Sequence, residues 1–284
     1  MELAYKIRQY VIMPILMIVL AITPAASSTD SAKLISTDTF VMDEAMVMGQ
    51  GITTDGEYYY TSGSLVGIGF TALAKFTVDG MEYADSHINP LPQKCEDRGN
   101  DHIGGISYYN GKIYASVEGG EPEQSCIVVY DAETLKHTGE IYDLPTADFN
   151  DGVPWCAVDS DTGYLYASKW KDTKTIYVYD VNNGMAPVKT LTLSATIKRI
   201  QGGEFLDGTL YLSQDTHGTG KLRSILSVDT ESGEVKTVAE RDIGSEKFEA
   251  EGMTFTKDEN GTVMHVLDYN KNIGIFVHHY AVDF

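Results

Sequence analysis

The sequence predicts an all-β fold made of five similar units. The first observation is an aspartate that ends an apolar, alternating run and recurs with spacings of 52, 49 and 49 residues, at Asp79, Asp131, Asp180 and Asp229. The second is a glycine turn that leads into a strand and keeps the same period, at Gly56, Gly111, Gly163, Gly208 and Gly261. Two markers with one period, over short β-rich segments, are typical of a β-propeller with one four-stranded blade per repeat.

The innermost strand of each blade is expected to open with a small or glycine-rich step. Inner strands crowd around the central channel, where backbones approach closely, and glycine permits this. The five steps are Gln50–Ile52, Gly104–Ile106, Trp155–Ala157, Gly202–Glu204 and Glu251–Met253. The second strand then follows the glycine turn, the third ends at the recurring aspartate, and a tight turn leads to the fourth, as at Val188–Leu191 and Val235–Val238.

The fifth repeat lacks a fourth strand. Its second and third strands fall at Gly261–Leu267 and Ile273–Tyr280, and the given chain ends at Phe284. The N-terminal stretch Leu34–Phe40 has no blade of its own and alternates suitably. We therefore expect a five-bladed β-propeller whose N-terminal strand closes the ring and covers an edge that would otherwise be exposed.

The first 27 residues predict a secretory signal peptide. Lys6 and Arg8 precede the apolar run Val11–Ile22, and small residues follow at Ala25–Ser28. Twelve apolar residues span only about 18 Å as a helix, against a bilayer core of roughly 30 Å. We expect a secreted or extracytoplasmic protein with one propeller domain over residues 28–284; the alternative is an anchor formed by an uncleaved signal.

The chain is strongly acidic, with 21 Lys and Arg residues against 41 Asp and Glu residues and a net charge of −20. Removal of the leader takes away Glu2, Lys6 and Arg8, which leaves 19 basic and 40 acidic residues and a net charge of −21. Such a surface repels nucleic acid and anionic lipid, so we expect neither as a partner. It attracts divalent cations such as calcium; the alternative is that the charge serves solubility or a salty medium. We expect a monomer.

Three cysteines are present, and an exported protein permits a disulfide. Cys95 falls in the connection that enters the second blade, and Cys126 falls just before the third strand of that blade. These two connections emerge on the same face of a propeller, so we predict a Cys95–Cys126 disulfide. Cys156 lies inside an apolar strand and is predicted to be a buried thiol.

Polar residues gather where inner strands start and second strands end, positions that share one face around the channel mouth. Those at inner-strand starts are Gln50, Asp101, His102, Asp151, Arg199, Gln201, Glu249 and Glu251. Those at second-strand ends are Glu118, Lys169, Trp170, Asp215, His217 and Asp268. The ring is expected to bring these groups within a small radius, although they lie far apart in the sequence.

The carboxylates of this set predict a metal site at Glu249, Glu251 and Asp268, since clustered carboxylates are what calcium takes. Strand alternation puts Glu249 and Glu251 on the same side, and two like charges held there are costly unless a cation or a proton is shared. Glu118 and Asp215 extend the acidic set.

The remaining mouth residues predict ligand contacts. His102 and His217, each with a carboxylate, are candidates for a transition-metal site or a general base. Trp170 and Lys169 could form an aromatic and cationic wall for a small ligand. The predicted ligand-binding set is Gln50, Glu118, Lys169, Trp170, Gln201, Asp215 and His217. The alternative is that these polar residues are solvated loop ends and that His102 is a hydrogen-bond partner lining the channel.

Through its repeat, over residues 34–284, the chain resembles the broad class of exported propellers that includes gluconolactonase-like, strictosidine-synthase-like and YVTN-type proteins. In the lactonase-like group an acidic residue at an inner-strand start helps to hold a divalent metal, and Glu251 in Glu251–Met253 is at the similar position. The step Gln50–Ile52 is also similar to the Gln-Gly-Leu step of the five-bladed plant-type glutaminyl cyclases.

These observations favour a binding protein whose mouth holds a small molecule, a glycan or an extracellular protein together with a divalent cation. The alternative is a metal-assisted hydrolase of the lactonase or esterase type, with His102, Glu251 and Asp268 as catalytic candidates. A third hypothesis, a scaffold for partner proteins, predicts an exposed apolar patch.

Overall fold

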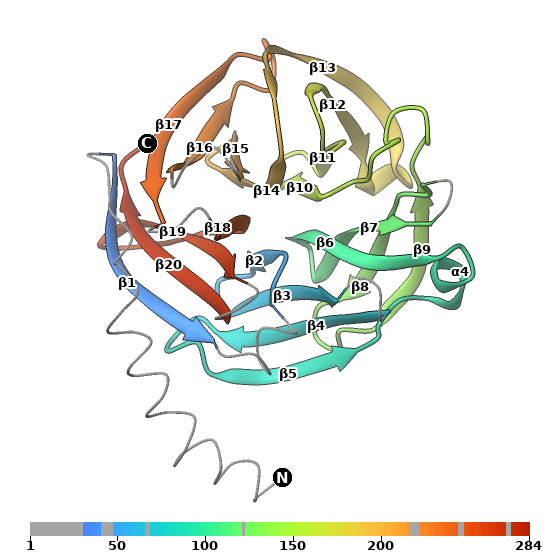
Figure 1. The fold of residues 1–284 in the computed structure, drawn as a ribbon, viewed down its shortest axis with the longest axis horizontal. Coiled ribbons are helices and arrows are strands. Elements are labelled where there is room, and N and C mark those ends of the chain that lie inside the picture. Colours follow the sequence, from blue (N-terminus) through green and yellow to red (C-terminus); the bar gives the residue numbers. More distant parts are fainter. Residues whose placement is uncertain are drawn as a thin grey trace, which may run out of the picture.

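The computed structural model describes residues 31–40, 48–65, 69–120, 123–215, 222–243, 247–270 and 274–284. Five four-stranded antiparallel sheets stand around a common axis, and the strands of each sheet follow one another from the centre of the ring outward to its rim (Figure 1). This confirms the predicted five-bladed β-propeller. Residues 1–27, the predicted signal peptide, lie outside the described residues.

Each blade contains consecutive strands, except that the fifth also recruits the first strand of the chain. Blade 1 consists of β2 (Ile52–Thr54), β3 (Tyr58–Leu65), β4 (Phe70–Thr77) and β5 (Tyr83–Ile88). Blade 2 consists of β6 (Asn100–Tyr109), β7 (Lys112–Gly119), β8 (Cys126–Asp131) and β9 (His137–Asp143), preceded by the single helical turn α4 (Gln93–Glu96). Blade 3 consists of β10 (Trp155–Asp159), β11 (Tyr164–Ser168), β12 (Thr173–Asp180) and β13 (Ala186–Ile197), with the short 3-10 turn η2 (Val181–Asn183) between the last two. Blade 4 consists of β14 (Ile200–Leu206), β15 (Thr209–Gln214), β16 (Leu222–Val228) and β17 (Val235–Asp242). Blade 5 consists of β18 (Glu249–Asp258), β19 (Gly261–Asn270), β20 (Gly274–Val282) and β1 (Ala32–Phe40).

The ring is closed by β1, as the sequence predicts. This strand pairs antiparallel with β20, from Ala32 opposite Val282 to Phe40 opposite Ile275, with a register shift between Leu34 and Ser36. Pairing with β1 satisfies the edge of β20, and it joins the first described residues of the chain to the last blade (Figure 1).

The inner strands approach one another as closely as the glycine-rich steps predict. A Cβ atom added to Gly104 would lie 2.6 Å from the backbone oxygen of Pro154 in the segment entering blade 3, and one added to Gly252 would lie 2.6 Å from the nitrogen of Ile52 in blade 1. Real Cβ contacts are not this short, so glycine is required at both seams.

The apolar core lies between neighbouring blades. Between blades 1 and 2, Tyr60 stacks on Tyr108 with ring centroids 5.9 Å apart. Trp155 of blade 3 is fully buried and belongs to a cluster that includes Leu212 and Leu226 of blade 4. Each blade buries its faces against two neighbours, so the core is divided into apolar clusters, one at each seam between adjacent blades. Within the ranges that the structure describes, no helix is long and apolar enough to cross a membrane.

Candidate functional site

On the side of blades 1 to 3, the mouth is organised around the His102 ring. This residue lies near the start of β6, and its Nδ1 is 2.7 Å from Glu118 Oε1 at the end of β7. Its Nε2 is 2.7 Å from Gln50 Oε1 of blade 1. The other Glu118 oxygen accepts the backbone N–H of Val153 at 2.7 Å, which ties in the segment entering blade 3. The imidazole is thus fixed between an amide and a carboxylate, the geometry that orients a histidine for hydrogen bonding or proton transfer.

The next part of the mouth links blades 3 and 4 through Trp170. Asp151 accepts the backbone N–H groups of Trp170 and Lys171, each at 3.1 Å, which fixes the turn after β11. The Trp170 carbonyl accepts the N–H of Arg199 at 3.1 Å, and the Arg199 guanidinium lies over the indole, 4.7 Å from the ring centroid. Lys169 is half-buried beside them, and its carbonyl accepts the Thr173 hydroxyl. Arg199 therefore lies on the Trp170 ring and adds a second cation to the predicted wall of Trp170 and Lys169.

A buried ion network joins blades 4 and 5. Asp215, directly after β15, accepts two hydrogen bonds from the Arg199 guanidinium through one oxygen, at 2.6 and 2.9 Å, and its other oxygen forms an ion pair with Arg223 Nε at 2.7 Å. The Asp215 and Arg223 side chains are fully buried. A second nitrogen of Arg223 donates to the carbonyl of Phe248, just before β18, at 2.6 Å. Asp215 is thereby committed to two arginines.

Asp268 forms a second buried ion pair. Arg241 donates to its two oxygens at 2.8 and 3.1 Å, and His278 Nδ1 lies 2.7 Å from one of them. Burial alone would raise the pKa of Asp268, but Arg241 and then His278 lower it to about 2. The group is a carboxylate whose two oxygens already have partners.

Glu249 and Glu251 lie together at the start of β18, as strand alternation predicts. Glu249 is partly exposed, and its Oε1 lies 4.0 Å from Arg199 Nη2. Glu251 is only 2 % exposed, and the charges that act on its carboxyl are those of Glu249, Asp215 and Asp268, opposed by Arg199. Burial raises its pKa well above the ordinary value, and Glu249 and Asp215 raise it further. The protonated form of Glu251 is favoured while nothing positive joins it.

The ring of contacts closes where the N–H of Gly252 donates to the carbonyl of Gln50 at 2.8 Å. The candidate residues therefore form three adjoining groups around one face. These groups are Gln50, His102 and Glu118; Asp151, Trp170 and Arg199; and Asp215, Glu249, Glu251 and Asp268.

Several residues that were predicted to form one site do not contact one another. His102 is bound to Gln50 and Glu118, whereas Asp268 is bound to Arg241 and His278. Gln201 is half-buried on β14, and His217 lies outside the described residues. Within the described part of the chain, no three His, Cys, Asp or Glu side chains are grouped so that they could hold a metal ion.

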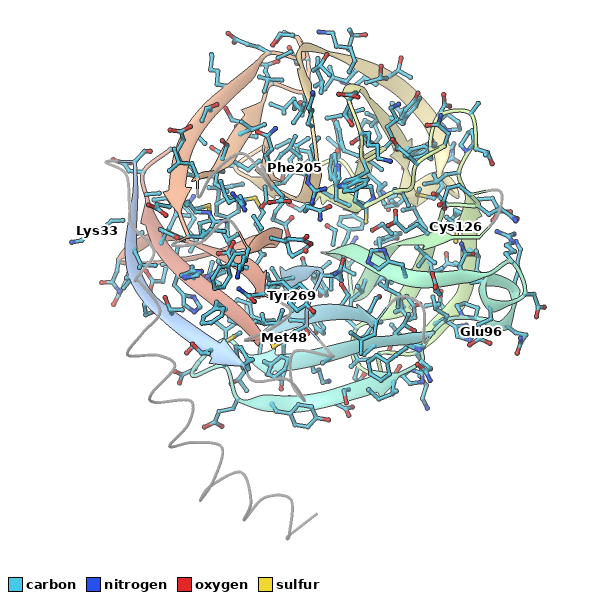
Figure 2. All side chains as sticks on the ribbon, in the orientation of Figure 1. Lys33, Met48, Glu96, Cys126, Phe205 and Tyr269 are labelled. Atoms are coloured by element: carbon cyan, nitrogen blue, oxygen red, sulfur yellow. The ribbon has the colours of Figure 1, made fainter. Side chains whose placement is uncertain are left out.

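The predicted cysteine pair is brought together at the rim of blade 2. The Sγ atoms of Cys95 in α4 and Cys126 in β8 lie 3.8 Å apart, both residues are buried, and both are free thiols. Figure 2 shows Cys126 toward the rim of the ring and Tyr269 near its centre. The disulfide itself stays a prediction. Cys156 is a buried thiol on β10, as expected.

The sequence analysis missed two buried arginines. Arg223 and Arg241 are opposite one another on β16 and β17, and both are fully buried. Arg223 lies two positions before buried Ile225, and Arg241 lies two positions after buried Ala239. Each arginine is therefore on the same face of its strand as a buried apolar residue. A charged residue at a buried strand position is the signal that could have identified them.

Comparison with known proteins places the chain in a family. A model described as a repeat of unknown function (DUF6923) matches residues 106–266, more than half of the chain, and the chain belongs to this family. A comparison with curated proteins finds no match.

Solved structures with similar folds share little sequence with the chain. The tail fibre of Staphylococcus aureus phage P68 is 16 % identical with a TM-score of 0.53, covering 88 % of this chain and 52 % of the fibre. A luciferin-regenerating enzyme is 11 % identical with a TM-score of 0.51, covering 87 % and 95 %. The Malassezia sympodialis allergen Mala s 1 is 8 % identical with a TM-score of 0.51, covering 81 % and 77 %. The chain spans about three fifths of the length of a hydrazine synthase and an RRP9 domain that it also matches. At these identities the likeness shows the fold alone.

Proposed function

We propose that this propeller binds a small polar molecule at its mouth, together with a divalent cation, calcium in particular, at Glu249 and Glu251. The observation that carries the proposal is the position of the Glu251 carboxyl, which is buried at the start of β18 beside the partly exposed Glu249, so that burial and Glu249 both raise its pKa. A cation would remove the repulsion between the two carboxylates.

The neighbouring contacts reduce the number of carboxylates that are available to bind the cation. Asp215 and Asp268 are already neutralised by arginines, so they are not available to a cation without breaking buried ion pairs. Glu118 is likewise bound to His102 and to the N–H of Val153, so we place the cation at the neighbouring pair Glu249 and Glu251. Calcium takes six to eight oxygen ligands, so a cation held by two carboxylates keeps positions for backbone oxygens, water or a ligand. This supports a cation that helps to hold a small molecule.

The other side of the mouth would supply hydrogen bonds to that molecule. His102 and Gln50 present paired polar groups, and Trp170 supplies an indole whose ring already accommodates the Arg199 guanidinium. A mixture of amide, imidazole, carboxyl and aromatic groups suits a sugar or another polyfunctional small molecule.

The proposal is tested by metal content and thermal stability of the purified protein before and after a chelator. A bound cation raises Tm by mass action, so chelation lowers Tm and added calcium restores it. Glu251→Gln is expected to abolish this response. Glu259→Gln, in the exposed turn at the other end of β18, is the matched control and should respond like the wild type. A metal-free protein with a Tm that ignores both chelator and calcium would overturn the cation site.

A second candidate function, a metal-assisted hydrolase, rests on the His102–Glu118 pair. A carboxylate 2.7 Å from Nδ1 orients the ring with Nε2 toward Gln50 Oε1, and Nε2 can take a proton from a substrate that displaces the Gln50 side chain. Hydrolysis of simple lactones or aryl esters in the presence of calcium, lost in His102→Gln and kept in His137→Gln, would support this function. Equal rates in the two variants would exclude His102 as the base.

A further inference from the structure

The face of blade 5 that meets blade 1 carries a chain of polar contacts with one residue from each of its four strands. Asp38 Oδ2 on β1 lies 2.9 Å from His279 Nε2 on β20. His279 Nδ1 lies 2.6 Å from His265 Nδ1 on β19, and His265 Nε2 lies 2.7 Å from the Thr256 hydroxyl on β18. Tyr59 of blade 1 places its hydroxyl 3.1 Å from His265 Nε2. We name Asp38, His279, His265 and Thr256 the polar ladder.

This ladder is unusual for its position. His265 and His279 are buried, and the blade 5 and blade 1 surfaces around them are apolar, with Ile52, Phe76 and Val277 among their members. At the outer end of the ladder, 47 % of the Asp38 side chain is exposed to solvent. Polar groups inside such an interface persist only when they satisfy one another. The ladder therefore joins the strand that closes the ring to the innermost strand of the same blade.

The hydrogen positions on the two rings limit how many protons the ladder can hold. With both rings neutral, His279 Nε2–H donates to Asp38 and His265 Nδ1–H donates to His279 Nδ1. One added proton on His279 is accommodated, because His265 can then accept at Nδ1 and donate from Nε2 to an oxygen of Thr256 or Tyr59. A second added proton puts two N–H groups face to face across 2.6 Å, where neither has an acceptor.

We infer that the polar ladder is an acid-sensitive latch that holds β1 in blade 5 at neutral pH and loosens it when the ladder takes up more protons than its hydrogen bonds can accommodate. The titratable groups that face the two rings are Asp38 from β1 and Tyr59 from β3. His278, the neighbour of His279, contacts Asp268 on the opposite face of the strand. The inference concerns ring closure and is independent of ligand binding at the mouth.

The direction of the pH effect follows from His265. Burial, and then His279, lower its pKa from the ordinary value to about 3. The unfolded or released chain therefore takes up the proton first as pH falls. The stabilisation by the latch is complete above about pH 6.5 and is progressively lost as pH falls toward 3.

Hydrogen exchange of β1, corrected for the intrinsic effect of pH, tests the latch in the full chain. Between pH 7 and pH 4, protection of β1 is expected to fall about tenfold more than protection of β12 in blade 3, as loss of one hydrogen bond to a charged group implies. His265→Phe, which cannot titrate, should remove this difference. His137→Gln, on the exposed part of β9, is the control and should keep it.

Asp38→Asn provides a second test of the latch if His265→Phe, which changes a buried residue, prevents folding. It removes only the exposed carboxylate, and we expect about tenfold less protection of β1 at pH 7 with blades 2 to 4 unchanged. Wild-type protection of β1 that falls in parallel with β12 would overturn the latch. An Asp38→Asn protein with wild-type protection of β1 at pH 7 would overturn it as well.

Discussion

At the scale of single residues, Glu204 is a half-buried carboxyl on an innermost strand of the ring. It lies on β14, and one of its oxygens accepts the hydroxyls of Thr53 in blade 1 and Thr254 in blade 5, at 3.0 and 3.3 Å. Its other oxygen accepts the N–H of Phe205 at 3.0 Å. Burial raises the pKa of Glu204 to about 7. Three blades thus meet at a group whose charge changes near neutral pH.

This pKa predicts a pH-dependent stability. The unfolded chain loses the Glu204 proton near pH 4.5 and the folded chain near pH 7, so stability is complete below about 4.5 and falls as pH rises to 7. The full effect is at most about 3 kcal/mol. Glu204→Gln should therefore gain free energy of unfolding relative to the wild type at pH 8 but not at pH 4, in urea titrations at both values. Exposed Glu231→Gln serves as control, and an equal response of the two variants would contradict the assignment.

Arg241 is a residue whose removal should be costly. Its guanidinium is fully buried on Asp268, so Arg241→Met leaves a buried carboxylate without its main counter-charge. We expect a loss of about 3 to 5 kcal/mol in the free energy of unfolding, most of it recovered by adding Asp268→Leu. A loss below about 1 kcal/mol, within the range of surface pairs, would mean that the ion pair is solvated.

At the scale of elements, Cys95 and Cys126 join α4 to β8 across a loop of 31 residues. Burial would raise the pKa of Cys95, but the hydrogen bond from Cys126 and the nearby Arg98 lower it, which favours Cys95 as the attacking thiolate. When the reduced chain refolds with oxidised glutathione, Cys95 displaces one glutathione thiolate, and Cys126 then displaces the second to form the disulfide. A mass lower by two hydrogens and a stability gain of about 3 to 4 kcal/mol are expected. Cys156→Ser should form the same bridge; a protein that stays reduced or becomes less stable would contradict the pairing.

The blades themselves were predictable because each repeat carries its own markers. The glycine turns and the recurring aspartates fixed the strand order, and the missing fourth strand of the last repeat assigned Leu34–Phe40 to ring closure. The ladder was not predictable in the same way. Adjacent His278 and His279 were expected on opposite faces, but their partners, Asp268 and Asp38, depend on the register of β19, β20 and β1, which the sequence does not specify.

At the scale of the whole molecule, the ring depends on β1. Deletion of residues 1–40 exposes the edge of β20 and removes Asp38 from the ladder. We expect the truncated chain to unfold less cooperatively and to lose at least about 10 °C in Tm. A synthetic peptide of residues 31–40 added in trans should restore part of the loss by strand addition, and a scrambled peptide should not. An unchanged Tm after deletion would show that blade 5 is stable with three strands.

The mouth illustrates how far sequence alone reaches on a propeller. Repeat geometry brought His102, Gln50 and Glu118 into contact from positions up to 68 residues apart, as the ring predicts. It could not identify the carboxylates that are paired with buried arginines, because Arg223 and Arg241 come from outer strands whose side-chain direction depends on packing. The structure was therefore needed to show that Asp215 and Asp268, of the predicted acidic set, are paired with buried arginines.

The central claim is that the buried Glu251 carboxyl contacts a bound cation. The most direct measurement is a crystal structure of the wild-type protein grown with calcium, compared with Glu251→Gln under the same conditions. We predict an ion 2.3 to 2.6 Å from oxygens of Glu251 and Glu249 in the wild type. We predict no ion at this position in Glu251→Gln. A mouth without an ion, with Glu251 hydrogen-bonded to another residue of the chain, would contradict it.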